Sequence, residues 1–188
     1  MENNQKIQIL PLTSPRWSDY ETVMGKSGCG GCWCSWWRLT NKDFYAFKKE
    51  ERKNYMRTIV QEGVEPGLIA YVDEAPAGWV TVAPREDFLR LKTSRILAPV
   101  DDEPVWCLPC FYVRSKYRHM GLMRILIDAA MEYARAHGAR IMEAYPNDPV
   151  SEANPLSIYT GVASTFFASG FEEVARRKPN RPVMRKFV

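Results

Sequence analysis

Apolar residues recur with a helical period most clearly between residues 122 and 136. Residues three or four apart share one face of an α-helix, and in this segment that face is apolar while the opposite face is charged. Gly138 ends the pattern. The spacing therefore predicts an amphipathic helix packed on a core. Its apolar face holds Leu122, Ile125, Leu126, Ala129, Ala130 and Tyr133, and its polar face Arg124, Asp128, Glu132 and Arg135.

Short apolar or alternating runs elsewhere predict strands. Runs of this length, bounded by Gly, Pro or polar residues, are typical of strands that bury one or both faces. The runs at 68–72 and 79–82 are separated by a few residues that include Pro and Gly, which predicts a hairpin. The predicted strands cover residues 7–10, 68–72, 79–82, 105–113, 141–145, 171–175 and 183–188.

Further helices are predicted in the intervals between these strands. Pro15 is compatible with a first helical turn. Thr40 precedes Asp43 by three residues, in the pattern of a capping box, and Gly63 supplies a stop signal. The Gly-, Cys- and Trp-rich segment at 25–38 is expected to be irregular. The predicted helices cover residues 14–24, 40–61 and 163–170, with a polar and partly helical stretch at 85–91.

The order of these elements predicts an α+β fold. A strand and two helices come first, then an antiparallel meander, then strand–helix–strand. Such an order favours a three-layer α/β/α arrangement, with a mixed and mostly antiparallel central sheet of about six to seven strands and helices on its faces. A chain of 188 residues without repeats or linkers suits a single domain spanning residues 1–188.

Composition narrows the class of protein. The hydrophobic fraction of 46% and the charged fraction of 26% are those of an ordinary globular chain. A net charge of +4 is too small to indicate nucleic-acid binding. No apolar run approaches the roughly 20 residues of a membrane span, and residues 1–6 lack a signal-peptide core. We therefore expect a cytoplasmic protein with no membrane or nucleic-acid partner and with reduced cysteines.

The most informative chemistry lies between the strand at 105–113 and the amphipathic helix. A basic turn joins them, and the helix begins at once. The first N–H groups of a helix lack internal partners and carry partial positive charge, so a pyrophosphate fits there. Gly121 allows close backbone approach. The alternative is a solvated basic turn, which is also common before helices. The basic residues concerned are Arg114, Lys116, Arg118 and Arg124.

The sequence Arg118-x-x-Gly121-x-Met123 after a strand resembles motif A of the GNAT-type N-acetyltransferase superfamily, whose pattern is Gln/Arg-x-x-Gly-x-Gly/Ala. The hairpin at 72–82 resembles the second and third strands of that family. The segment at 166–171 resembles its late Leu-Tyr-x-x-x-Gly-Phe segment. The resemblance covers roughly residues 67–188 and implies a GNAT-like acyl-CoA N-acyltransferase fold.

This resemblance implies acetyl-CoA as co-substrate and a small-molecule or protein amine as acceptor. The strand before motif A would hold the pantetheine arm through its main chain, and the loop N–H groups would hold the pyrophosphate. The amine would attack the thioester directly, and an N–H near Phe111 would stabilise the oxyanion. The implied cofactor-binding residues are Phe111, Tyr112, Val113, Arg118, His119, Met120, Gly121, Leu122, Met123 and Arg124.

Two positions depart from the family pattern. Met123 stands where Gly or Ala is usual, and its side chain would crowd the phosphates. Phe167 stands where the family often has the Tyr that protonates the departing thiolate, and Phe cannot donate a proton. Tyr159 is the candidate substitute, the alternative being a packed aromatic with its hydroxyl at the surface. Cys110 is the second candidate catalytic residue.

The cysteines permit two interpretations. Two CxxC pairs can form a tetrahedral zinc site, because each short spacing lets both sulfurs reach one ion. The zinc ligands would be Cys29, Cys32, Cys107 and Cys110. Alternatively, these are small apolar core residues. Because strands alternate their faces, Cys107 and Cys110 would point in opposite directions unless Pro109 causes a bulge.

The segment at 29–38 also suggests an acceptor pocket. In the family that the sequence resembles, the chain after the first helix often borders this pocket, beside the strand that carries Cys110. The candidate pocket residues are Cys32, Trp33 and Trp36, with Trp37 as a further part of the wall. The alternative for the tryptophans is a hydrophobic plug between two helices.

Three functions remain from the sequence. The leading hypothesis is an acyltransferase enzyme, an N-acetyltransferase whose acceptor stays open between a polyamine, an antibiotic, an amino acid and a protein N-terminus. The second is a non-catalytic acyl-CoA-binding or sensor protein, which Phe167 favours. The third is a zinc-stabilised interaction protein. Neither His119 nor His137 has a visible Asp or Asn orienter, which disfavours a thiol hydrolase.

Overall fold

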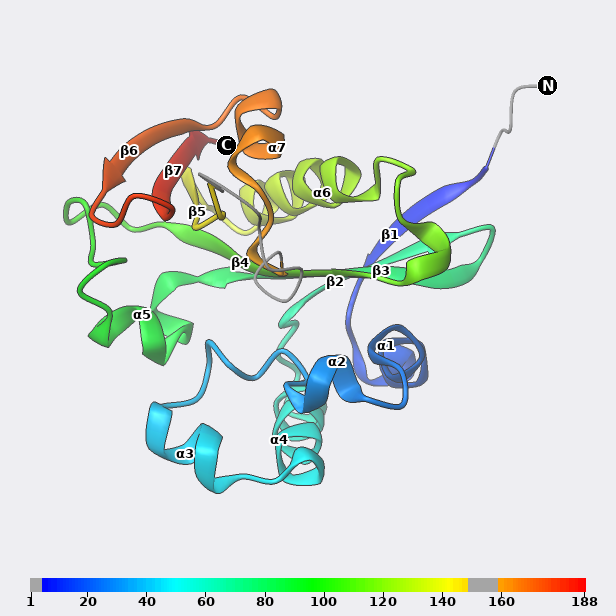
Figure 1. The fold of residues 1–188 in the computed structure, drawn as a ribbon. Coiled ribbons are helices and arrows are strands. Elements are labelled where there is room, and N and C mark those ends of the chain that lie inside the picture. The colour runs from blue at the N-terminus through cyan, green and yellow to red at the C-terminus, as the bar shows by residue number, and fades with distance from the viewer. Residues whose placement is uncertain (1–4, 149–158) are drawn as a thin grey trace.

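A seven-stranded sheet forms the centre of the molecule (Figure 1). The computed structural model describes residues 5–148 and 159–188. The strand order is β1-β2-β3-β4-β5-β7-β6, and every neighbouring pair is antiparallel except β4 and β5. The strands are β1 Ile7–Pro11, β2 Gly67–Val72, β3 Ala75–Pro84, β4 Trp106–Val113, β5 Ile141–Ala144, β6 Glu172–Arg176 and β7 Pro182–Phe187. The sequence-based prediction of a mixed, mostly antiparallel sheet with flanking helices is confirmed.

Helices cover both faces of the sheet, as Figure 1 shows: α6 and α7 lie on one side and the helices of the N-terminal half on the other. The described helices are α1 Trp17–Met24, α2 Gly28–Gly31, α3 Asn41–Ala46, α4 Lys49–Gln61, α5 Leu89–Thr93, α6 Leu122–Ala136 and α7 Ala163–Ala168. Short 3-10 turns span Ser14–Arg16, Arg85–Asp87 and Ser115–Tyr117. None of the described helices is long and apolar enough to cross a membrane.

Successive side chains of β3 point into two separate cores, because a strand alternates its faces. Trp79 is fully buried among residues of the N-terminal helices, whereas Val80 is fully buried against α6. The apolar face predicted for α6 is confirmed in part. Leu122, Leu126 and Ala130 are buried, but Ile125, Ala129 and Tyr133 are only partly buried. The buried face is shifted and includes Ile127, Met131 and Ala134. A hydrophobic core therefore packs against each face of the sheet at its centre.

The single helix predicted for residues 40–61 is two helices. Phe47 and Lys48 have extended backbone, with ψ angles of 133° and 171°. Thr40 caps α3 as predicted, since its hydroxyl accepts a hydrogen bond from the N–H of Asp43 at 3.1 Å. A second cap begins α4, where the carboxylate of Glu51 accepts the N–H of Lys48 at 2.6 Å. This second capping interaction lets the chain turn between the two helices.

A bulge in β4 changes which face of the sheet its side chains point to. Cys110 pairs with Thr81 and Cys107 with Ala83, so β4 uses three residues where β3 uses two. The extra residue lies at Leu108 or Pro109, the position where the sequence allowed a bulge. Cys107 and Cys110 consequently face the same core, against the simple alternation of a strand.

Candidate functional site

The parallel pairing between β4 and β5 is short. It runs from Trp106 with Met142 to Leu108 with Ala144, whereas β4 continues to Val113. Among the described residues, no strand pairs with this last part of β4 on the β5 side. The sheet therefore opens at its centre, directly after the bulge.

The main chain of β4 offers hydrogen-bonding groups to this opening. The N–H of Arg114 donates to the carbonyl of Ala77 at 3.0 Å, so Arg114 points its N–H towards β3. In an antiparallel ladder, successive residues alternately point their N–H and C=O groups towards the partner strand and away from it. Phe111 and Val113 therefore face the opening, and the carbonyl of Val113 indeed accepts from Nε of Arg118 at 3.1 Å.

The loop after β4 prepares the N-terminus of α6. His119 and Gly121 have positive φ angles of 63° and 72°, which turn the chain sharply. The first helical hydrogen bond runs from the N–H of Arg124 to the carbonyl of Gly121 at 3.0 Å. The N–H groups of Leu122 and Met123 precede it and are the unpaired donors that begin every α-helix. A Cβ atom added at Gly121 would meet nothing within 4 Å, so this side of the turn is open.

Met123 extends away from Gly121. A Cβ atom placed on Gly161 would lie 2.2 Å from Cε of Met123 and 2.8 Å from a ring carbon of Phe166. The methionine therefore packs against the chain that leads into α7, where Gly161 leaves room for it. The described atoms of its side chain do not cover the open side of the Gly121 turn.

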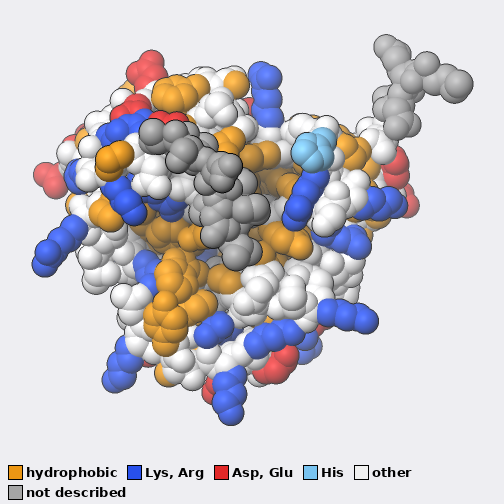
Figure 2. All heavy atoms as spheres, viewed as in Figure 1, with side chains coloured by type: hydrophobic (Ala, Val, Ile, Leu, Met, Phe, Trp, Pro, Cys, Tyr) orange, Lys and Arg blue, Asp and Glu red, His pale blue; other side chains and the backbone are white. Residues whose placement is uncertain are grey.

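A cleft of about 500 Å³ lies beyond the end of β5, beside α5. Aromatic and basic side chains contribute to its wall, among them Trp37, Arg90, Tyr159, Lys178 and Arg181. Figure 2 shows hydrophobic side chains gathered in the middle of one face of the molecule, with Lys and Arg around them. The wall thus combines aromatic rings with many polar and basic groups, and such a concave site offers both apolar and polar contacts to a small molecule.

A comparison with protein families matches residues 33–154 to the acetyltransferase (GNAT) family, over more than half of the chain. The chain belongs to the GNAT acetyltransferase family. A comparison with curated protein sequences found no match.

Solved structures similar to this GNAT chain include three named N-acetyltransferases. A PaiA N-acetyltransferase from Thermoplasma acidophilum in complex with coenzyme A is 14% identical, covers 97% of this chain and 99% of its own, and has a TM-score of 0.56. The aminoglycoside N-acetyltransferase AAC(6')-Iy in complex with CoA is 18% identical over 95% and 99%, with a TM-score of 0.56. A ribosomal-protein-alanine N-acetyltransferase from Brucella melitensis is 18% identical over 96% and 99%, with a TM-score of 0.55. At these identities the likeness is one of fold.

The two aromatic residues compared in the sequence lie in different surroundings. Phe167 of α7 is 49% exposed, whereas its neighbour Phe166 is fully buried. Tyr159 lines the cleft. Burial raises the pKa of the Tyr159 hydroxyl, although the nearby Arg181 opposes the rise. The Tyr159 phenol is therefore neutral at ordinary pH and keeps its proton.

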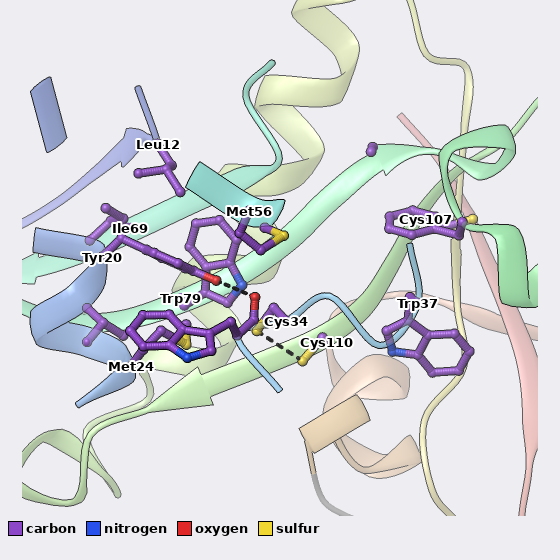
Figure 3. Packing of buried hydrophobic residues seen from close by; sticks show 14 of the residues in the cluster. Leu12, Tyr20, Met24, Cys34, Trp37, Met56, Ile69, Trp79, Cys107 and Cys110 are labelled. Carbon is purple, nitrogen blue, oxygen red and sulfur yellow. Dashed lines mark hydrogen bonds between the residues drawn. The ribbon is translucent and has the colours of Figure 1, made fainter. Parts of the chain in front are cut away.

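The cysteines of this GNAT chain do not form the alternative zinc site. Cys34 and Cys110 point towards each other, with their Sγ atoms 3.7 Å apart, and Cys107 lies apart from that pair (Figure 3). The sulfur of Cys107 instead contacts the hydroxyl of Tyr145 at 3.1 Å. Within residues 5–148 and 159–188, no three Cys, His, Asp or Glu side chains converge on a metal position. The zinc hypothesis for Cys29, Cys32, Cys107 and Cys110 is therefore not supported.

Burial also keeps these thiols protonated. It raises the pKa of both Cys29 and Cys32 to about 12, with further repulsion from Cys34. The hydrogen bond with Cys34 lowers the pKa of Cys110, but burial and repulsion from Cys32 and Cys29 together raise it by more, so the net pKa is raised. Because a thiolate is the nucleophilic form, none of these three cysteines is poised to attack a thioester.

The tryptophans of the segment 33–37 divide between core and cleft. Trp33 is 3% exposed, and its carbonyl accepts a hydrogen bond from the hydroxyl of Tyr20 at 2.7 Å. Trp36 is half-buried and stacks on Arg90, and Trp37 lines the cleft. Trp37 is one of the tryptophans that the sequence suggested for the pocket wall. Arg90 and Arg181, which also line the cleft, were missed, because they lie far from the Trp-rich segment in sequence.

Proposed function

We propose that this GNAT protein transfers the acetyl group of acetyl-CoA to a primary amine of an acceptor by direct attack. The observation that supports this most strongly is the opening between β4 and β5, followed at once by the Gly121 turn and the free N-terminus of α6. Two structurally similar N-acetyltransferases are described in complex with coenzyme A.

The residues around the opening suit such a co-substrate. The main chain of Phe111 and Val113, which faces the opening, would form hydrogen bonds with the amides of the pantetheine arm. For this, Arg118 would give up its present hydrogen bond to the carbonyl of Val113. The helix N-terminus suits the pyrophosphate because its N–H groups and the helix dipole both favour an anion. We assign to this binding site Phe111, Tyr112, Val113, Arg118, His119, Met120, Gly121, Leu122, Met123 and Arg124.

The reaction is a substitution at the thioester carbonyl. The nitrogen of the neutral amine forms a bond to the carbonyl carbon, and the carbon–sulfur bond then breaks to release the thiolate of coenzyme A. The nitrogen gives up one proton to solvent, and the thiolate takes up one, so that an amide and a free thiol result. The N–H of Phe111 would stabilise the oxyanion between these steps. The raised pKa values of Cys32 and Cys110 favour this direct route over an acetyl-cysteine intermediate.

Tyr159 is the side chain that we propose as proton donor to the thiolate. It lines the cleft and keeps its proton at neutral pH. Cys110 is the second candidate, since it lies on β4 where the sheet opens. Cys32, Trp33, Trp36 and Trp37 remain predicted pocket residues, and of these Trp37 lines the cleft.

The test is a calorimetric titration with acetyl-CoA of the parent, Gly121→Glu and Gly63→Glu. Gly63 is a matched control, because it too has a positive φ angle, of 90°, and open space at its Cβ position. We expect the parent and Gly63→Glu to bind, and Gly121→Glu to lose affinity by about tenfold or more, since its carboxylate repels the pyrophosphate.

Thiol release with a panel of amines then separates catalysis from binding. Free coenzyme A should accumulate only when an amine is present. Binding without thiol release for any amine would favour an acyl-CoA-binding or sensor protein. Equal loss of binding in both glutamate variants would show that the helix N-terminus is not the site.

A further inference from the structure

The described wall of the cleft beside α5 carries positive charge and no carboxylate to balance it. Arg90, Lys178 and Arg181 contribute to its wall, and none of the described lining residues is Asp or Glu. Two shielded arginines elsewhere in the described structure are instead paired with carboxylates. Arg38 contacts Asp87 at 3.1 Å, and Arg85 contacts Glu143 at 2.8 Å.

Arg181 is half-buried and held by neutral groups. Its Nη1 donates to the amide oxygen of Asn147 at 3.1 Å and to the hydroxyl of Thr160 at 2.9 Å. These two bonds fix the guanidinium in place but do not balance its charge. Withdrawing an unpaired charge from water costs free energy, and an anion in the cleft would recover much of that cost.

Arg90 is fixed from another direction. Its Cζ lies 3.4 Å from the ring centroid of Trp36, and its Nε and Nη1 bond the carbonyl of Trp36 and the side chain of Asn41. Its Nη2 is buried and has no hydrogen-bond partner among the described residues. Arg90 therefore keeps an unused donor and, like Arg181, has no carboxylate partner among the described residues.

We propose that the cleft binds an acceptor that carries an anionic group, a carboxylate or a phosphate, on the same molecule as the amine to be acetylated. The inference rests on the proposed N-acetyltransferase function and defines its acceptor class. Arg90 and Arg181 bind the anion by charge-assisted hydrogen bonds, and Trp37 contacts the apolar part of the acceptor.

The same charges favour the reactive form of the amine. A protonated amine cannot attack a carbonyl, because its lone pair is occupied. Positive charge nearby destabilises an ammonium group and lowers its pKa. The cleft therefore anchors the acceptor by its anion and favours the neutral form of its amine, whose proton is released to solvent, because none of the described lining residues is an acid that could hold it.

Matched amine pairs test this inference. L-Phenylalanine is compared with L-phenylalaninamide, and O-phosphoethanolamine with ethanolamine, with spermidine as a polycation. The readouts are kcat/KM for thiol release and, without acetyl-CoA, the thermal shift that each compound produces. The anionic member of at least one pair should exceed its neutral partner by about tenfold or more in kcat/KM. Which pair responds distinguishes carboxylate from phosphate.

Variants tie the preference to the two arginines. Arg181→Gln and Arg90→Gln should each lower the anionic-to-neutral ratio of kcat/KM to about a tenth of the parent value. Arg181→Lys should retain part of it. Arg135→Gln is the control, because Arg135 is an exposed residue of α6 paired with Glu132. Melting curves identify any variant that fails to fold, in which case the parent's own pairs decide the question.

Two outcomes would overturn the inference. One is that both members of each pair give the same kcat/KM and the same thermal shift. This outcome includes the case in which neither member gives any response. The other is a loss of acetyl-CoA affinity in Arg181→Gln, because the cations would then serve the co-substrate. Acetyl-CoA binding by the parent, measured in the same preparation, keeps either outcome distinct from a failure of the proposed function.

Discussion

Tyr159 is the side chain on which a proton-transfer step can be tested at the scale of a single residue. Its hydroxyl is the only group that Tyr159→Phe removes, so the shape of the cleft should be retained. General acid catalysis contributes about 10²- to 10⁴-fold. We expect kcat for thiol release to fall by about 10²-fold with little change in KM. Tyr45→Phe, at a side chain that is 70% exposed, is the control. An unchanged kcat would point to Cys110 instead.

The pH dependence of the reaction follows from the same tyrosine. Burial raises the Tyr159 pKa above its ordinary value of 10.0. An acid acts only while protonated, so its contribution is full below the raised pKa and is lost as the pH rises through it. Between about pH 7 and pH 9, kcat should therefore show no decline attributable to Tyr159. A decline in this range in the parent that is absent from Tyr159→Phe would contradict the assignment.

At the scale of an element, β5 depends on one buried carboxylate. Glu143 is fully buried and pairs with Arg85 at 2.8 Å and Arg185 at 2.7 Å, so it joins β5 to β7 and to the chain after β3. Glu143→Gln should lower the free energy of unfolding by about 3–5 kcal/mol, because two shielded guanidinium groups lose their shared partner.

The exposed pair of Glu103 and Arg140 provides the comparison. Their side chains are 51% and 77% exposed, so Glu103→Gln should cost less than about 1 kcal/mol. Urea unfolding of both variants measures the difference. A similar small effect of the two substitutions would show that the Glu143 network adds little net stability.

The elements that the sequence predicts well are those with a local signal. The period of α6 and the apolar runs of β2 to β5 are visible in the chain itself. The break between α3 and α4 was missed because the helical pattern continues across Phe47, and only the bond from Lys48 to Glu51 restarts the helix. For β4 the sequence predicted regular alternation and allowed a bulge at Pro109 only as an alternative. The bulge could not be decided from the sequence, because it depends on the register of pairing with β3.

The same distinction separates the two parts of the candidate site. The strand, turn and helix N-terminus around Gly121 are continuous in sequence, so their chemistry can be read from residue spacing. The cleft gathers Trp37, Arg90, Tyr159 and Arg181 from distant segments. No local pattern indicates that these side chains meet. The lack of a carboxylate among the described residues of the cleft wall is visible only when the neighbouring side chains are in place.

On the scale of the whole molecule, the short pairing of β4 with β5 divides the sheet into two parts, which we call plates and which this pairing alone connects within the sheet. One plate comprises β1 to β4 with α6, and the other β5 to β7. A co-substrate bound along the opening would contact both plates and restrict their relative motion. Hydrogen exchange should then slow more at residues 106–108 and 141–144 than at 69–72 when acetyl-CoA binds. Uniform slowing across the sheet would mean that it moves as one rigid plate, with or without its co-substrate.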